Sequence, residues 1–135
     1  MAMIEWNKSM SVGIKEFDTH HRRIIDHINE LSGSLATANA GKVAEEALTE
    51  LSNYCAYHFL AEESAMAIYK VPELAAHKEE HRMFIDKLFQ LTGHMQTNKE
   101  CVPRELLDFL WEWLSKHILE TDKKYTVALR AAGMD

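Results

Sequence analysis

The sequence has few of the residues that turn a chain or cross-link it. It contains 5 glycines and 2 prolines in 135 residues, too few for the many turns of an all-β fold. Frequent alanine, leucine, glutamate and lysine favour helix, and we predict an all-α protein. The 2 cysteines, Cys55 and Cys101, are too few for a disulfide framework, so we expect free thiols.

Two classes of partner are disfavoured by features that the chain lacks. No apolar run approaches the roughly 20 residues needed to cross a bilayer, and the N-terminus does not have the pattern of a secretory signal. The net charge is −6, and no cluster of lysine and arginine makes a basic face for nucleic acid. We therefore expect a cytoplasmic protein that binds neither membranes nor nucleic acid.

The remaining pattern is that of one helical domain, residues 1–135. Residues 1–17 have no sustained helical period and predict an irregular arm anchored by Trp6. The predicted helices run from Asp18, as N-cap, to about Asn39, from about Lys42 to Tyr69, from Pro72 or Glu73 to Thr97, and from Pro103 to about Ala131. Short connections favour antiparallel neighbours, so residues 18–131 predict an up-down-up-down four-helix bundle.

Histidine is the unusual component of this bundle. Of the 8 histidines, five fall on the apolar stripes that should face the bundle axis, and two acidic residues share those stripes. The set is His21, His58, Glu62, His77, His81, His117 and Asp122. A single such histidine is usually an ordinary core side chain. Five imidazoles and two carboxylates around one axis would be costly to desolvate without a cation, so we predict a metal site.

The spacing of these residues supports shared ligation. Two pairs are four residues apart and therefore lie on one helix face: His58 with Glu62, and His77 with His81. His117 and Asp122 are separated by a five-residue step, which an ideal α-helix turns through about 140°. Both can reach one centre only with a local distortion of the helix or an approach from one flank.

The number of donors favours two metal ions. Seven side chains exceed the four ligands of a closed zinc site and the six of one octahedral ion. In a pair of octahedral irons, five imidazoles, two bridging carboxylates and one oxo or hydroxo bridge would leave a single open position. If His77, His81 and His117 bind one iron, that position belongs to the iron of His21 and His58, where a small exogenous ligand would bind.

The sequence resembles the haemerythrins, including bacteriohaemerythrins, over nearly its whole length. The matching motifs are Trp6, Val12-Gly13-Ile14, Asp18, His21, His58-Phe59, Glu62, Met66, Tyr69, Pro72, His77, His81, Trp113-Leu114, His117-Ile118, Asp122 and Tyr125. The resemblance implies a four-helix bundle with two non-haem irons. It also implies their ligands: His77, His81 and His117 on one iron, His21 and His58 on the other, and Glu62 and Asp122 as bridges.

The resemblance also implies a function. In haemerythrins dioxygen binds at the less-coordinated iron and is reduced as both irons become ferric, and its release reverses this transfer. Residues that match the apolar pocket of the family are Ile24, Phe59, Trp113, Leu114 and Ile118, which would exclude water and protons. Ordinary core packing is compatible with the same residues. We expect reversible dioxygen binding for storage, delivery to an oxygen-consuming enzyme or sensing, and no catalytic residues.

Several residues fall outside this pattern. His20 stands where the family commonly has glutamine; we expect it to point away from the axis, although it offers an alternative ligand register. His27 and His94 have no place among the ligands and are expected to be exposed or incidental core residues. Cys55, one turn before His58, is expected to pack in the core.

Three other functions remain open. A ferritin-like di-iron oxidase would carry Glu-x-x-His pairs, which are absent from this sequence, and peroxidase-like or nitric oxide chemistry would be incidental. An oxygen- or redox-sensing domain of a signalling protein is possible because haemerythrin domains also occur in such fusions; the initial methionine and the lack of a linker favour a free-standing protein. A structural zinc or manganese bundle is disfavoured by the number of ligands.

Overall fold

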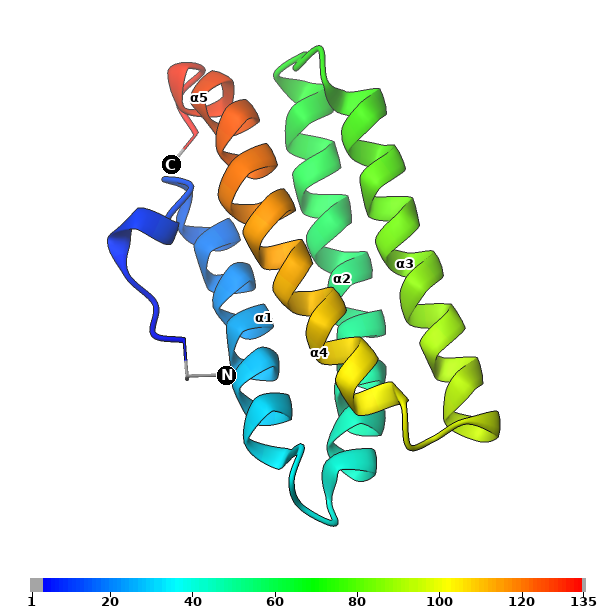
Figure 1. Ribbon diagram of the computed structural model, residues 1–135. Coiled ribbons are helices and arrows are strands. Elements are labelled where there is room, and N and C mark those ends of the chain that lie inside the picture. Colours follow the sequence, from blue (N-terminus) through cyan, green and yellow to red (C-terminus); the bar gives the residue numbers. More distant parts are fainter. Residues whose placement is uncertain (1–3, 135) are drawn as a thin grey trace.

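Four helical rods stand side by side in the computed structural model, which describes residues 4–134 apart from the side chain of Tyr125 (Figure 1). The elements are η1 (Lys8–Met10), α1 (Lys15–Ser34), α2 (Ala40–Ile68), α3 (Leu74–Thr97), α4 (Val102–Glu112), η2 (Trp113–Asp122) and α5 (Lys123–Ala131). The last three follow one another without a break and form the fourth rod (Figure 1). Neighbouring rods are antiparallel, so the predicted up-down-up-down bundle is confirmed.

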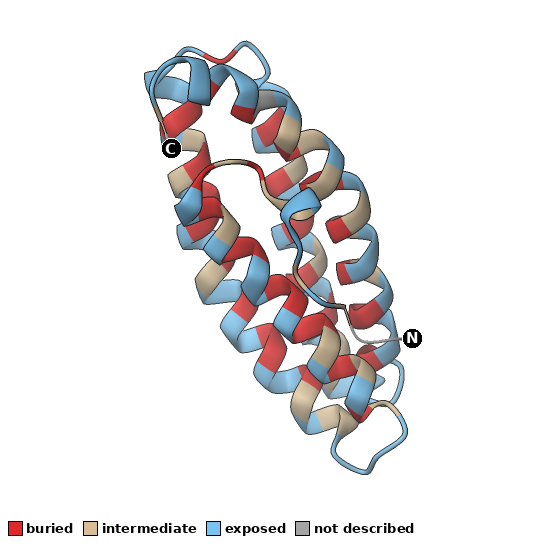
Figure 2. Ribbon diagram, turned by 90° about the vertical axis from the view of Figure 1, so that its left-hand side faces the viewer, coloured by how far each residue is buried: buried red, intermediate tan, exposed pale blue. Residues whose placement is uncertain are grey.

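The rods pack through the stripes that the sequence predicts. In α1, for example, Ile24, Ile28 and Leu31 recur at steps of three and four and are fully or almost fully buried. Buried residues line the inner faces of the rods and exposed residues cover the outside (Figure 2). Burial of one such side chain contributes about 1.5–3 kcal/mol, which makes this packing the main source of helix stability.

The buried apolar residues form two clusters, one toward each end of the bundle. The larger cluster runs along all four rods and ends near Ile24 of α1 and Phe59 of α2. The smaller cluster includes Phe17 of α1, Met66 of α2 and Leu129 of α5. On each of these rods a short stretch of buried polar positions lies between the two clusters, and this level contains the candidate site.

The beginning and end of α1 differ from the prediction. The helix begins at Lys15, three residues before the predicted cap, and Asp18 lies in its first turn. The Asp18 carboxylate accepts hydrogen bonds from the Val12 backbone N–H at 2.8 Å and the Ser11 hydroxyl at 2.5 Å. It therefore fixes the arm to the bundle and does not cap the helix. The helix ends at Ser34, before the predicted end near Asn39.

The N-terminal arm lies along α1. The Ile4 N–H donates to Asn29 Oδ1 at 2.8 Å, and Asn29 Nδ2 donates to the Ile4 carbonyl, also at 2.8 Å. Trp6 packs against the larger cluster, and the Arg22 guanidinium carbon lies 4.8 Å from the centroid of its ring. None of the described helices is long and apolar enough to cross a membrane.

Candidate metal centre

The seven residues predicted as metal ligands converge at the level between the two apolar clusters. All four rods contribute to this set: His21 from α1, His58 and Glu62 from α2, His77 and His81 from α3, and His117 and Asp122 from η2. Each of these side chains is buried, the most exposed being His58 at 5%. The axis-facing stripes of the sequence therefore identified residues that are neighbours in space.

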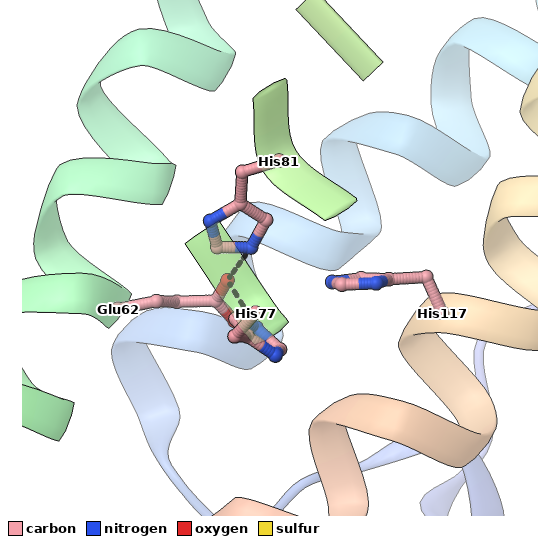
Figure 3. Close-up of side chains that lie close together, drawn as sticks. All are labelled: Glu62, His77, His81 and His117. Carbon is pink, nitrogen blue, oxygen red and sulfur yellow. Dashed lines mark ion pairs between the residues drawn. The ribbon is translucent and has the colours of Figure 1, made fainter. Parts of the chain in front are cut away.

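One group of donors lies between α2, α3 and η2. It consists of Glu62, His77, His81 and His117, whose donor atoms are all within 4.8 Å of one another (Figure 3). The Glu62 Oε1 atom lies 3.1 Å from His81 Nε2 and 3.6 Å from His77 Nε2. Three imidazoles and one carboxylate thus face a common point.

A second group lies on the α1 side of the first. It consists of His21, His58, Glu62 and Asp122, again within 4.8 Å of one another. His21 Nε2 is 3.2 Å from Asp122 Oδ2, and His58 Nε2 is 3.4 Å from Glu62 Oε1. Glu62 belongs to both groups, so the two candidate metal positions are adjacent.

Asp122 also reaches both groups. Its Oδ2 faces His21, while its Oδ1 lies 3.1 Å from the Nε2 atoms of His77 and His117. Each of the two carboxylates therefore has imidazoles of both groups beside it. This is the arrangement that two bridging carboxylates would require, with three imidazoles on one side and two on the other.

A π-helix accounts for the five-residue step between His117 and Asp122. Residues Trp113–Asp122 form η2, in which the backbone hydrogen bonds join residues i and i+5 in place of i and i+4. Each residue of a π-helix turns through a smaller angle than in an α-helix, so residues five apart lie much nearer to one face, and both side chains are buried in the bundle. Of the two alternatives that the spacing left open, the structure shows the local distortion of the helix.

Several buried polar atoms of the site have no hydrogen-bond partner among the described residues. Among the described residues, no hydrogen bond reaches the Nε2 atoms of His21, His81 and His117 or either carboxylate oxygen of Asp122. A buried polar atom in this state costs about 1–3 kcal/mol. Metal ions would compensate this cost, because imidazole nitrogen and carboxylate oxygen are ligands that iron, zinc and manganese accept.

Without metal, the pKa values of the buried histidines and carboxylates depend on burial and on close pairs of opposite charge. Burial and the neighbouring Asp122 act to raise the pKa of Glu62, but the surrounding histidines outweigh them and hold it below its usual range. Burial acts to lower the pKa of His77, yet the Asp122 and Glu62 carboxylates raise it to about 9. Burial dominates at His58 and lowers its pKa to about 3. His77 therefore holds a proton at neutral pH that a metal ion must displace.

Three of the histidines have a second partner on the outward-facing ring nitrogen. His81 Nδ1 is hydrogen-bonded to Glu63 Oε2 at 2.8 Å, and His117 Nδ1 lies 3.3 Å from Glu80 Oε2. The third pair consists of two imidazoles, with His58 Nδ1 2.5 Å from His20 Nδ1. Such partners orient ligands in metal sites. The sequence reasoning missed Glu63 and Glu80, although each is adjacent in sequence to a predicted ligand.

The residues that were predicted to form an oxygen pocket lie on the side of the donor groups nearer the larger cluster. Phe59 stacks on the His81 ring with centroids 3.9 Å apart, and Trp113 stacks on His117 at the same distance. Ile24, Leu114 and Ile118 are buried members of that cluster. Trp113 is half-buried, and its outer side lines a groove of about 440 Å³ between α3 and the fourth rod.

The remaining histidines and cysteines lie outside the two donor groups. His20 is buried and points at His58, not at the carboxylates, so the groups contain His21 in its place. His27 is buried, with Nε2 3.3 Å from Glu50 Oε2, whereas His94 is half-buried. Both cysteines are free thiols, as expected, and the first of them is buried in the larger cluster.

The chain is similar in sequence to known hemerythrin proteins. Residues 12–129 match the family described as Hemerythrin HHE cation binding domain. A bacteriohemerythrin of Stenotrophomonas maltophilia is 31% identical over 131 residues, which cover 97% of this chain and 84% of that protein. A bacteriohemerythrin of Methylococcus capsulatus is 29% identical over 132 residues, covering 97% of this chain and 100% of that protein. A crystal structure of wild-type hemerythrin superimposes with a TM-score of 0.78 at 27% identity, covering 95% of this chain and 98% of that one.

Proposed function

Because the chain belongs to the haemerythrin family, we propose that it holds two iron ions at the candidate metal centre and binds dioxygen reversibly there, for storage or delivery. The observation that supports this most strongly is the sharing of donors between two adjacent groups. Glu62 belongs to both groups, and Asp122 lies beside imidazoles of both. A site for one ion would not need two carboxylates placed in this way.

The proposed ligands divide unequally between the two positions. His77, His81 and His117 would bind one iron, and His21 and His58 the other, with the two carboxylates between them. When bound, a pair of ferrous ions supplies the two electrons that reversible binding of dioxygen requires. The position with two imidazoles would keep a place for the exogenous ligand.

The side chains next to the centre would protect it from water. Phe59 and Trp113 cover the His81 and His117 rings, and aliphatic side chains fill the space toward the larger cluster. An apolar lining of this kind excludes water and protons from a metal site. It would thereby favour release of dioxygen over loss of reduced oxygen species, as a storage or delivery protein needs.

The proposal is tested by measuring iron content and the absorption spectrum in three successive states. The protein is first reduced without oxygen, then exposed to oxygen, then freed of oxygen again. We expect two irons per chain and a ferric charge-transfer band that appears with oxygen and disappears on its removal. The zinc-loaded protein is the control, because zinc has no redox chemistry and should give no such band. Irons that oxidise at once and remain ferric would contradict reversible binding and favour an oxidase or a redox sensor.

A further inference from the structure

His20 has a buried position beside the candidate metal centre without belonging to it. It lies on α1 directly before His21, and its side chain is 6% exposed. Its ring stands perpendicular to that of His58, with the two centroids 4.6 Å apart and the two Nδ1 atoms 2.5 Å apart. The ring is therefore in direct contact with a proposed ligand, on the side of that ligand opposite to the metal.

The surroundings of His20 fix which way its ring faces. The rings of Tyr54 and Tyr57 meet it edge to face, with centroid distances of 5.3 Å and 5.7 Å. Its Nε2 atom points outward and lies 4.0 Å from an oxygen of Glu16, whose side chain is 48% exposed. The ring consequently presents Nδ1 to the interior and Nε2 to the surface.

The short distance between the two Nδ1 atoms limits the protons they can carry. At 2.5 Å, one atom must donate and the other must accept, so the pair shares one proton. If His20 donated it, a neutral His58 ring would carry its own proton on Nε2, the atom that lies 3.4 Å from Glu62. That nitrogen could not then bind a metal ion. If His58 donates, its Nε2 lone pair faces the candidate centre.

His58 and His81 differ in what determines the tautomer of the ring. The outward partner of His81 is Glu63, and an ionised carboxylate only accepts hydrogen bonds. The tautomer of His81 is thus determined by its partner. The partner of His58 is an imidazole, which can either donate or accept, so the tautomer of His58 depends on the tautomer of His20.

We infer that His20 is the positioning residue of His58: its Nδ1 accepts the His58 Nδ1–H and so directs the His58 Nε2 lone pair at the metal position shared with His21. This inference rests on the proposed metal centre, but it does not depend on iron or dioxygen. A neutral acceptor also makes His58 a weaker electron donor to the metal than His81, which is paired with a carboxylate.

The tautomers can be measured directly in the wild-type protein loaded with zinc, which is diamagnetic. Long-range ¹H–¹⁵N correlation spectra distinguish a protonated, an unprotonated and a metal-bound ring nitrogen. We expect His58 to have a protonated Nδ1 and a metal-bound Nε2, and His20 to have an unprotonated Nδ1 and a protonated Nε2. A proton on His20 Nδ1 would overturn the inference.

Two substitutions add a binding measurement. His20→Leu removes the acceptor and should weaken zinc binding at the position of His21 and His58 about 10- to 100-fold, with the other position little changed. His20→Gln supplies an amide oxygen as acceptor and should restore most of the affinity. His27→Leu is the matched control, because it removes another buried histidine of α1 outside both donor groups.

Each outcome separates this inference from the proposal on which it rests. Equal zinc titrations of His20→Leu and His27→Leu would show that His20 does not position His58. If His20→Leu does not fold, the tautomers of the wild-type protein still decide the question. Failure of the wild-type protein to bind zinc at all would overturn the metal centre itself, and with it the role of His20.

Discussion

His117 Nε2 and Asp122 Oδ1 lie 3.1 Å apart although their residues are five positions apart in the chain. The π-helical backbone of η2 makes this possible, because its wider turn brings residue i+5 much closer to the face of residue i than an α-helix would. In an α-helix the carboxylate would have to stand at position 121 to occupy the same face. Thr121, the residue found there, is instead partly exposed.

This geometry predicts that the carboxylate cannot be moved by one residue. Asp122→Ala should lose two-metal binding, and adding Thr121→Asp to it should not restore the second metal, because position 121 is turned away from the centre. Metal content per chain, measured after loading with zinc, checks both variants. Thr121→Asp alone serves as control and should bind two ions. Recovery of two ions in the double variant would mean that the segment is α-helical when metal is bound.

Glu62 and Cys55 give a second test, because both are buried on the same helix within two turns of each other. Glu62→Ala removes the carboxylate shared by both donor groups, so we expect it to lose at least one of two metal ions. Cys55→Ala shortens a side chain in the larger cluster and should leave the metal content unchanged. Metal analysis on the purified variants decides this, and two ions in Glu62→Ala would contradict its bridging role.

The fold and the donor set were predictable because both depend on helical periodicity. A stripe with steps of three and four defines one face of a helix, whatever its neighbours are. Residues on that face, such as His77 and His81, had to point at the axis once four helices were assigned.

The ends of α1 were not predictable in this way, because Asp18 bonds to the arm through tertiary contacts that no local spacing specifies. Ala36, Ala38 and Ala40 near its end are also compatible with helix, so composition does not mark the turn there.

The outer partners of the histidines were not predictable for a similar reason. Glu63 and Glu80 stand beside axis-facing residues, where glutamate is typical of a solvated surface. Their contacts with His81 and His117 depend on side-chain rotamers and on the distance between rods. His20 was expected to point away from the axis, and it lies outside both donor groups. Its contact with His58 joins α1 to α2 and became visible only in the folded structure.

The position of the Trp113 ring against His117 predicts that this side chain slows oxidation of the site. Its ring stacks on His117, and both residues line the groove between α3 and the fourth rod. Trp113→Ala would remove the ring that covers His117 and widen the groove for water, so the oxygenated protein should convert to the ferric form faster. We expect about a tenfold increase, equivalent to about 1.4 kcal/mol in the barrier. Trp111→Ala is the control, since Trp111 is 42% exposed and does not line the groove. Equal rates in the two variants would remove Trp113 from the protective lining.

The raised pKa of His77 predicts how the stability of the metal-free protein depends on pH. Burial opposes protonation of His77, but Asp122 and Glu62 outweigh it and raise the pKa to about 9, against about 6.5 in the unfolded chain. The folded state therefore binds this proton more tightly. The stabilisation is fully present below about pH 6.5 and is lost as the pH rises through about 9. His21 acts in the same direction: burial lowers its pKa, but the effect of Asp122 and Glu62 is larger and the net shift is upward. His58, whose pKa is lowered, affects the stability only at lower pH.

Thermal unfolding of the metal-free protein at about pH 6.5 and about pH 9.5 measures this effect. A contribution on the order of 2 kcal/mol should lower Tm by roughly 5–10 °C at the higher pH. His77→Gln, which cannot take up the proton, should show a smaller difference between the two pH values. Zinc-loaded protein should not lose stability over this range, because the metal replaces the proton and binds more tightly as competition from protons falls. The same Tm at both pH values in the metal-free wild type would mean that the carboxylates do not hold a proton on His77.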